Sequence, residues 1–166
     1  MEKKIIGASA FVKVAGIAKV PAKIDTGADS SSIWASSIEM SEDGVLSFKL
    51  FGPNSQFYTG DTIKTKDFKV VVTRSSHGDE KIFYRTRLQI VIKGRKINSL
   101  FTLSNRSNNN FPILIGKRTI RGKFIVDVKK AAIIFEKNSK TNPLNQELAQ
   151  DPFQFHQKYI KNEGDI

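Results

Sequence analysis

The chain has 166 residues, of which 39% are hydrophobic and 26% charged, a balance that indicates one folded domain with a core and excludes a disordered chain. Its 27 basic and 16 acidic residues give a net charge of +11, which leaves a polyanionic partner open. The chain has no cysteine, which excludes disulfides and thiolate zinc sites, and no apolar run of membrane-spanning length.

Residues 1–14 resemble a weak secretion signal, but Lys13 ends their apolar run after eight residues. We therefore expect a mature N-terminus and a cytoplasmic protein.

From residue 4 to about residue 135 the pattern is typical of β-strands separated by turns. Alternating apolar and polar residues, or runs of β-branched and aromatic ones, predict strands over residues 11–14, 18–24, 45–51, 68–72, 81–86, 87–92, 97–103, 111–116, 123–128 and 131–135. Turn-forming residues at 75–79 and 93–96 join the flanking strands into hairpins. Strands at this spacing predict a closed all-β domain.

Helix is predicted only in short pieces. Residues 30–37 and 118–121 are each expected to form about one turn, the second ended by Gly122. After residue 135 the sequence becomes rich in Asn, Gln and Lys, so we divide the chain into a domain over residues 1–135 and a polar tail over residues 136–166. In the tail, Asp151 and Pro152 suit the N-cap and first position of a helix over residues 153–161.

The stretch with the most chemical information is AKIDTGADSSS, from Ala22 to Ser32. An apolar strand leads directly into Asp25, Thr26 and Gly27. This order places a carboxylate at a strand end, beside a glycine that lets the backbone pass close to a ligand. Taken alone, a DTG tripeptide is more typical of an ordinary turn that caps a following helix.

A second motif, FPILIGKR over residues 111–118, changes that interpretation, together with the hairpins that separate the two motifs. The sequence resembles the retropepsin-like aspartic proteases, in which DTGA(D/S) follows an inner strand, a flap hairpin comes next, and an (I/L)(I/L)G strand crosses behind the catalytic loop. Residues 25–29 match the first motif and residues 113–116 the second. The hairpin over residues 72–83, with its tip at 76–79, lies where the flap belongs.

Two further stretches, TLSNRS at 102–107 and GKFIVDV at 122–128, extend the resemblance to most of the chain, from about residue 5 to residue 128. They are similar to a bacterial, RimB-like family often labelled "ATP-dependent zinc protease". That family occurs beside ATP-grasp glutamate ligases that modify ribosomal protein.

The resemblance implies an acid-protease barrel with a flap and gives roles to individual residues. The implied roles are catalysis by Asp25, Thr26 and Gly27, substrate binding by Ala28, Asp29, Ser76, His77, Gly78 and Ile115, and support of the loop and of a dimer by Thr26, Gly116, Lys117 and Arg118. The family usually has arginine directly after the second motif. Because this chain has lysine there, either Lys117 or Arg118 is expected to fill the supporting role.

The residues support the aspartic label and argue against the zinc and ATP labels. The two histidines, His77 and His156, offer no ligand cluster, and no glycine-rich loop precedes a Lys-Ser or Lys-Thr pair. We expect no metal and no cofactor. Trp34, where the family often has histidine, is expected to pack in the core, and both histidines are expected at the surface.

A single DTG motif predicts a dimer. Peptide hydrolysis by aspartates needs two carboxylates that share one proton, so the second Asp25 must come from a two-fold-related copy. The predicted function is that of an aspartic endopeptidase, active as a homodimer at acidic to near-neutral pH.

The basic residues are scattered, which favours a solvated basic surface over a nucleic-acid site. Such a surface would attract acidic peptide substrates, for example polyglutamate or a segment of ribosomal protein. No recognition helix or aromatic-interleaved motif is visible, so neither nucleic acid nor a membrane is an expected partner. Three alternatives stay open: a non-catalytic peptide- or protein-binding member of the fold, a basic nucleic-acid-binding barrel, and a protease limited to self-processing.

Overall fold

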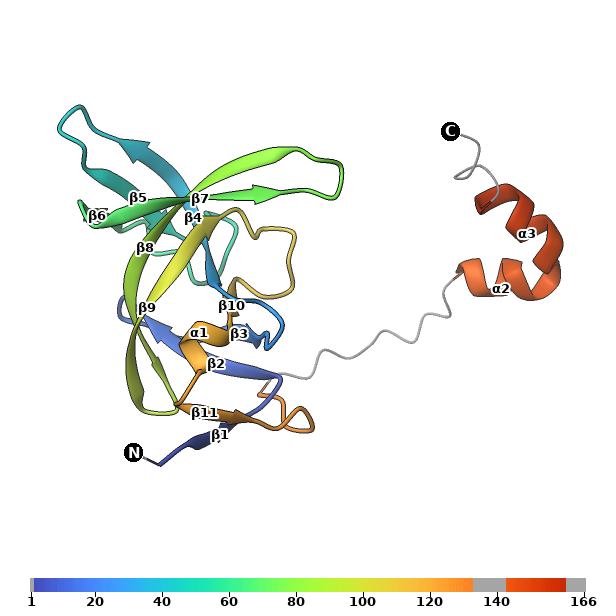
Figure 1. The fold of residues 1–166 in the computed structure, drawn as a ribbon, viewed down its shortest axis with the longest axis horizontal. Coiled ribbons are helices and arrows are strands. Elements are labelled where there is room, and N and C mark those ends of the chain that lie inside the picture. Colours follow the sequence, from blue (N-terminus) through green and yellow to red (C-terminus); the bar gives the residue numbers. More distant parts are fainter. Residues whose placement is uncertain (1, 133–142, 161–166) are drawn as a thin grey trace. The chain divides into compact units, whose positions relative to one another are not determined.

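The structure is a computed structural model that describes residues 2–132 and 143–160. These two stretches belong to separate compact units, which divide between residues 133 and 134. The first unit is almost entirely β-structure, with one short helix (Figure 1). Its elements are β1 (Lys4–Ile6), β2 (Ser9–Val14), β3 (Ile17–Ile24), β4 (Ser31–Met40), β5 (Leu46–Leu50), β6 (Thr62–Thr65), β7 (Phe68–Arg74), β8 (Glu80–Ile92), β9 (Arg95–Ser104), β10 (Ile113–Ile115), α1 (Lys117–Ile120) and β11 (Phe124–Val126).

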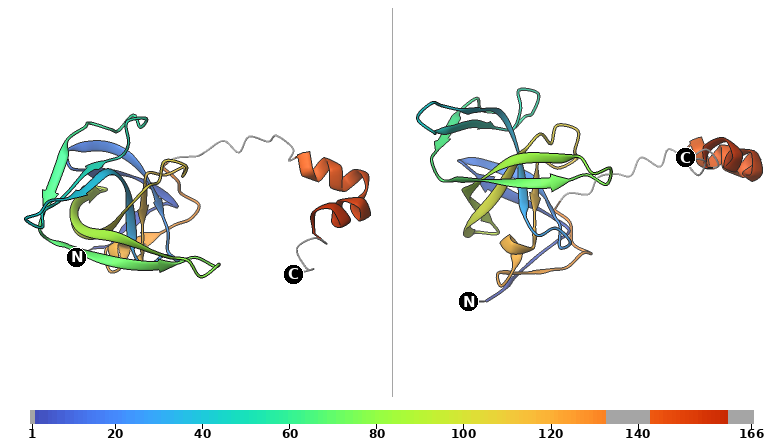
Figure 2. Two further views of the ribbon diagram at one scale, coloured as in Figure 1. Left: turned by 90° about the horizontal axis from the view of Figure 1, so that it is seen from above. Right: turned by 45° about the horizontal axis from the view of Figure 1, so that its top comes forward.

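Six strands close into a mixed barrel in the order β10, β3, β2, β8, β9, β4, and β4 returns to β10 to complete the ring. The closing strand β10 is parallel to β3 and antiparallel to β4. Strands β5 and β6 continue the sheet beyond β4, and β7 pairs with β8, as Figure 2 shows from two directions. The predicted closed all-β fold is therefore confirmed.

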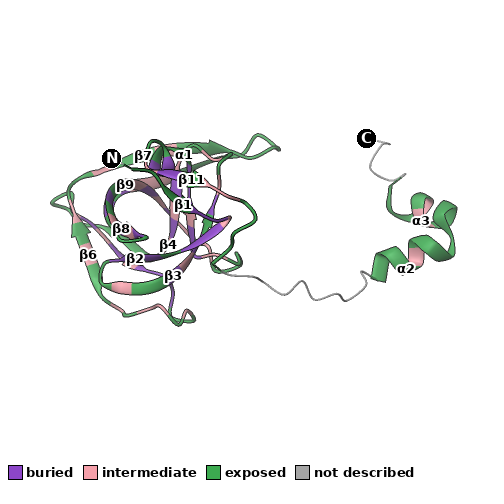
Figure 3. Ribbon diagram, turned by 90° about the horizontal axis from the view of Figure 1, so that it is seen from below, coloured by how far each residue is buried: buried purple, intermediate pink, exposed green. Residues whose placement is uncertain are grey.

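The hydrophobic core fills the inside of this barrel, because every second residue of each strand points inward. In β2, Ala10, Val12 and Val14 are buried, whereas Phe11 and Lys13 between them are exposed. Figure 3 shows the buried residues on the barrel strands and exposed residues over the outlying hairpins. Full burial of a large apolar side chain, such as that of Val12 or Val14, stabilises the fold by about 1.5–3 kcal/mol.

Both predicted hairpins are confirmed. The β7–β8 hairpin pairs Arg74 with Glu80 across the turn at residues 75–79. In the β8–β9 hairpin the turn is tighter than predicted, since Ile92 pairs with Arg95 across Lys93 and Gly94 alone. Both turn residues have positive φ, 48° and 74°, as a two-residue turn between twisted strands requires.

The helical turn predicted over residues 30–37 is wrong, because this segment belongs to strand β4. Ser31, Ile33 and Ala35 are buried at alternate positions, which is the period of a strand. The segment pairs with β9 on one side and with β10 and β5 on the other. These long-range hydrogen bonds override the local preference of a serine-rich turn. The other predicted turn, near residue 118, is confirmed as α1.

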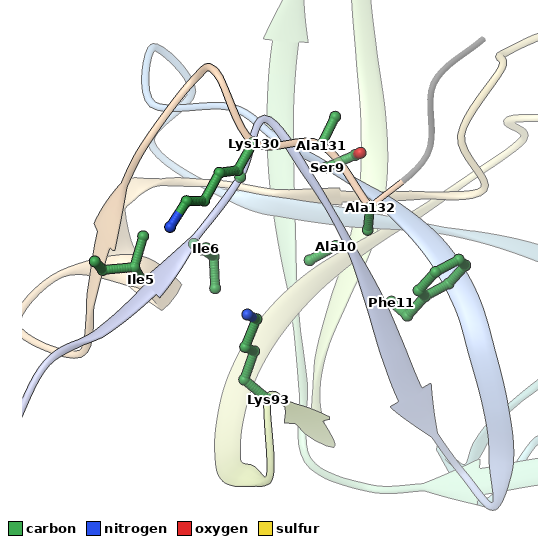
Figure 4. A pocket seen from close by; sticks show the side chains of 10 residues that line it. Ile5, Ile6, Ser9, Ala10, Phe11, Lys93, Lys130, Ala131 and Ala132 are labelled. Carbon is green, nitrogen blue, oxygen red and sulfur yellow. The ribbon is translucent and has the colours of Figure 1, made fainter.

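The strand predicted over residues 131–135 falls partly outside the described residues, which stop at 132 in this unit. Ala131 and Ala132 themselves are not in a strand. They instead form part of the wall of a cavity of 340 Å³, which Phe11 and Lys93 also line (Figure 4).

The second unit contains α2 (Pro143–Gln150) and α3 (Pro152–Tyr159). Helix α3 begins as predicted, because the Asp151 carboxylate accepts a hydrogen bond from the Gln154 backbone N–H at 2.9 Å and Pro152 follows it. Helix α2 was not predicted. Lys158 donates to Glu147 at 2.7 Å, which links the helices and lowers the pKa of Glu147. Among the described residues, no helix has both the length and the apolar character needed to cross a membrane.

Candidate active site

The loop that follows β3 fixes the carboxylate of Asp25, which is half-buried. The Asp25 backbone N–H donates to the Ile115 carbonyl at 2.9 Å, which continues the pairing of β3 with β10. Its Oδ1 accepts hydrogen bonds from the backbone N–H groups of Gly27 at 3.0 Å and Ala28 at 3.2 Å. Among the described residues no donor bonds Oδ2. One carboxylate oxygen is therefore bound to the loop, and the other is available for chemistry.

The two sequence motifs meet where Gly116 passes behind this loop. The Lys117 N–H donates to the Ala28 carbonyl at 2.7 Å, and the Arg118 N–H donates to the Asp29 carbonyl at 3.3 Å. A Cβ atom on Gly116 would lie 2.4 Å from the Ser30 carbonyl oxygen and 2.9 Å from that of Ala28. Only glycine permits this approach. The role of residues 116–118 in supporting catalysis and a dimer stays a prediction.

The side chain of Lys117 contacts the last residue of the DTGAD motif. Its Nζ lies 2.8 Å from Asp29 Oδ1. The hydrogen bond and then the charge of Lys117 hold the pKa of Asp29 below its ordinary value of 3.8, and the Arg118 charge adds a smaller effect in the same direction. Because both side chains are more than half exposed, the pair contributes little to stability by itself.

A chain of buried hydroxyl groups, which the sequence did not predict, anchors the segments that flank the loop. The Ser31 hydroxyl accepts from the Gly116 N–H at 3.0 Å and bonds Thr119 at 2.7 Å. Thr119 in turn bonds Ser99 at 2.5 Å, so the network joins β4, α1 and β9. All three side chains are buried and all are satisfied, which makes the network rigid. No local pattern distinguishes these hydroxyl residues in the sequence.

Arg106 makes a second support that the sequence indicated only as part of a motif. Its Nε donates to the Phe111 carbonyl at 3.0 Å and its Nη1 to the Ser32 hydroxyl at 3.1 Å. Partial burial lowers the pKa of the Arg106 guanidinium. The residue thus connects the stretch before β10 to β4, directly beyond the Asp25 loop.

The predicted flap residues Ser76, His77 and Gly78 lie exposed at the tip of the β7–β8 hairpin. The tip is closed by its own hydrogen bonds between Ser75 and Asp79. Within the part of the chain that the structure describes, no hydrogen bond or ion pair joins this tip to residues 25–29. The role of the tip in substrate binding stays a prediction.

The remaining predicted residues divide between surface and core. Thr26 is exposed next to Asp25, whereas Ile115 is fully buried and its role in substrate binding stays a prediction. Trp34 packs on the core as predicted, with its ring against Gly52. His77 and His156 are exposed, as predicted. Residues 2–132 and 143–160 contain no group of three or more His, Cys, Asp or Glu placed to hold a metal.

A wide depression of 510 Å³ adjoins the loop on its basic side. It is lined by Asp29, Lys117, Arg118 and Arg121. The depression therefore combines three positive side chains with one carboxylate, that of Asp29 at the end of the DTGAD motif.

Comparison with known proteins agrees with this geometry. Residues 6–137 match the family described as RimB-like, retropepsin-like aspartic endopeptidase RimB. No curated protein sequence matches the chain. The chain is similar to the crystal structure of Lpg0085, a DUF785 protein of unknown function from Legionella pneumophila subsp. pneumophila str. Philadelphia 1. That likeness has a TM-score of 0.60 at 20% identity, covers 78% of this chain and 97% of the other, and shows the shared fold. The family match spans most of the sequence, and the chain therefore belongs to the RimB-like family of retropepsin-like aspartic endopeptidases.

Proposed function

We propose that the protein is an aspartic endopeptidase that works as a homodimer, in which Asp25 of each copy contributes one half of a catalytic pair. The geometry of the Asp25 loop carries this proposal. Two backbone N–H groups orient the carboxylate through Oδ1, and Oδ2 has no partner among the described residues. Thr26 beside it is exposed, so its hydroxyl is available to a second copy of the loop.

The chemistry needs both carboxylates, with one proton between them. The charged aspartate takes a proton from a water molecule as the water oxygen attacks the peptide carbonyl carbon. The protonated aspartate gives its proton to the carbonyl oxygen, which forms a tetrahedral diol. The aspartate that took the proton from water then gives it to the amide nitrogen, and the other aspartate accepts a proton from a diol hydroxyl. The C–N bond breaks to leave a carboxylic acid and an amine, and the pair again holds one proton. Two carboxyl groups about 3 Å apart cannot both be ionised, so the pair keeps one proton at acidic to near-neutral pH. We expect activity in that range.

The substrate of this proposal is a peptide or protein segment with acidic side chains, such as polyglutamate or a segment of ribosomal protein. Lys117, Arg118 and Arg121 line the depression beside the loop, and the whole chain carries a net charge of +11. Positive side chains at the edge of a cleft raise the local concentration of acidic chains and the rate at which they associate. In this proposal residues 1–135 are the protease domain and residues 136–166 are an appended tail.

Replacing Asp25 with Asn tests the proposal. An amide oxygen can still accept the hydrogen bonds from Gly27 and Ala28, so the loop and the unfolding midpoint should be preserved. Cleavage of an acidic peptide, followed by mass spectrometry, should be lost, and a statine-type inhibitor should block the wild type. Asp43→Asn, in an exposed turn, is the matched control and should keep full activity.

Full activity of the Asp25→Asn variant would overturn the proposed mechanism. If the wild type binds the peptide, neither protein cleaves it and binding survives the substitution, the non-catalytic alternative replaces this proposal.

A further inference from the structure

A small pocket of 160 Å³ lies between β8, β9 and α1, next to the segment that leads from the catalytic loop into β4. Arg85, Arg87 and Arg118 line it, together with Ser30 and Asn98. Arg85 and Arg87 lie two residues apart on β8, so they share one face of that strand. Arg118 comes from α1.

The positive charge of this pocket is not balanced by the protein. No carboxylate lines it. Within residues 2–132 and 143–160, the ion pairs join Arg74 to Glu80, Lys117 to Asp29 and Lys158 to Glu147, and none involves the three pocket arginines. Asp29 is close enough to feel the charge of Arg118, but its carboxylate already bonds Lys117. Guanidinium groups gathered at one pocket repel one another unless an anion lies between them.

One wall of the pocket is held in place by hydrogen bonds within the protein. The Arg85 guanidinium, which is half-buried, donates to the Ser30 hydroxyl at 3.1 Å and to the Thr102 hydroxyl at 3.3 Å. Thr119, the neighbour of Arg118, is fixed by its bonds to Ser31 and Ser99. Binding an anion would therefore need little further ordering of Arg85, whereas the exposed side chains of Arg87 and Arg118 would become ordered on binding.

We propose that this pocket is a binding site for one compact oxyanion, a phosphate or a carboxylate group. The planar fork of arginine matches both groups through paired hydrogen bonds. A volume of 160 Å³ accommodates such a group. The site is separate from the Asp25 carboxylate, and its occupation requires no catalysis. Because Ser30 bonds Arg85 and directly follows Asp29, a bound anion would also hold the end of the catalytic loop.

The experiment is a titration of the full ¹⁵N-labelled chain with sodium phosphate at constant ionic strength, followed by NMR. We expect saturable shifts of the amide signals of Ser30, Arg87 and Ser99 in the wild type and equally in Asp25→Asn. Arg87→Gln should weaken binding about tenfold, and adding Arg118→Gln about tenfold again, since each removes a charge-assisted contact. The control Lys13→Gln with Lys96→Gln removes the same charge from exposed positions at another surface pocket.

A second titration, with a short acidic peptide in place of phosphate, identifies the source of the oxyanion. Phosphate that displaces the peptide from these residues assigns the pocket to a peptide carboxylate. Phosphate that binds there without competing with the peptide assigns it to a free oxyanion. The absence of saturable shifts with both ligands, or an equal loss of binding in the lysine control, overturns the proposal. The Asp25→Asn arm keeps this result independent of whether the protein cleaves peptides.

Discussion

At the scale of single residues, Gly116 is the point where the two halves of the site touch. A methyl group there would collide with the carbonyl oxygens of Ser30 and Ala28, so Gly116→Ala must push the loop away from β10. We expect a loss of about 1–3 kcal/mol in the free energy of unfolding, measured with urea, and a larger proportional loss of peptidase activity.

Gly16→Ala is the matched control for that prediction. Gly16 has a φ of +79° and nothing within 4 Å of an added Cβ. The substitution should cost about 1–2 kcal/mol through backbone strain alone and leave activity unchanged. The prediction fails if Gly116→Ala keeps full activity and loses no more stability than the control.

The contact between Lys117 and Asp29 predicts a dependence on pH. Lys117 lowers the pKa of Asp29 in the folded chain, so the contribution of the pair to stability is present above the ordinary value of 3.8. That contribution is lost as the pH falls through the lowered value. In Lys117→Met the pKa of Asp29 should rise toward 3.8, as ¹³C NMR of the carboxyl group would measure.

Arg118→Gln should raise the pKa of Asp29 by less than Lys117→Met does, because the Arg118 charge is the smallest of the causes that lower it. Identical titration of Asp29 in the wild type and in Lys117→Met would contradict the ion pair.

At the scale of elements, the β7–β8 hairpin offers a test of the flap. Residues 75–79 can be replaced by Asn-Gly, a two-residue turn that preserves the pairing of Arg74 with Glu80. The tip is exposed, so the free energy of unfolding should change by less than about 0.5 kcal/mol. If the tip covers substrate, kcat/KM should fall about tenfold or more.

Lys93→Asn is the control for the hairpin, because it places the same Asn-Gly turn at the tip of β8–β9. It should change neither stability nor kcat/KM. Unchanged peptidase kinetics after shortening of the β7–β8 turn would exclude residues 76–78 from substrate binding.

The elements also show which parts of the fold and of the candidate site the sequence can predict. Alternating residues such as Val12 and Val14 predict their strands because inward and outward positions follow a period of two. The serine run before Ile33 favours a helical turn locally, whereas its strand character comes from pairing with β9 and β10, far away in the chain. Asp25 and Gly116 were predicted together because both lie in recognisable motifs. The Ser31–Thr119–Ser99 network and the three-arginine pocket have no such local signal.

At the scale of the whole molecule, the proposed shared site makes a quantitative prediction for mixed dimers. Wild type and Asp25→Asn, refolded together in equal amounts, should show roughly one quarter of the activity of the same total amount of wild type, since only dimers with two intact Asp25 residues act. Chains that act alone would give about one half. Wild type refolded with an equal amount of Asp43→Asn, in place of Asp25→Asn, should keep its full activity. Sedimentation of the wild type should show twice the chain mass of 18.6 kDa.

The double pairing of β10 has a consequence for the biosynthesis of the protein. The strand that closes the barrel is also the strand that receives the Asp25 backbone N–H, and its partner in β3 was synthesised about 90 residues earlier. A nascent chain that has not yet reached Ile115 therefore contains Asp25 but cannot hold it in position. Because contacts over so long a loop carry a large entropic cost, we expect this closure to come late in folding. We therefore expect the Asp25 loop to become ordered together with the finished barrel, so that a partly made or partly unfolded chain lacks an ordered aspartate.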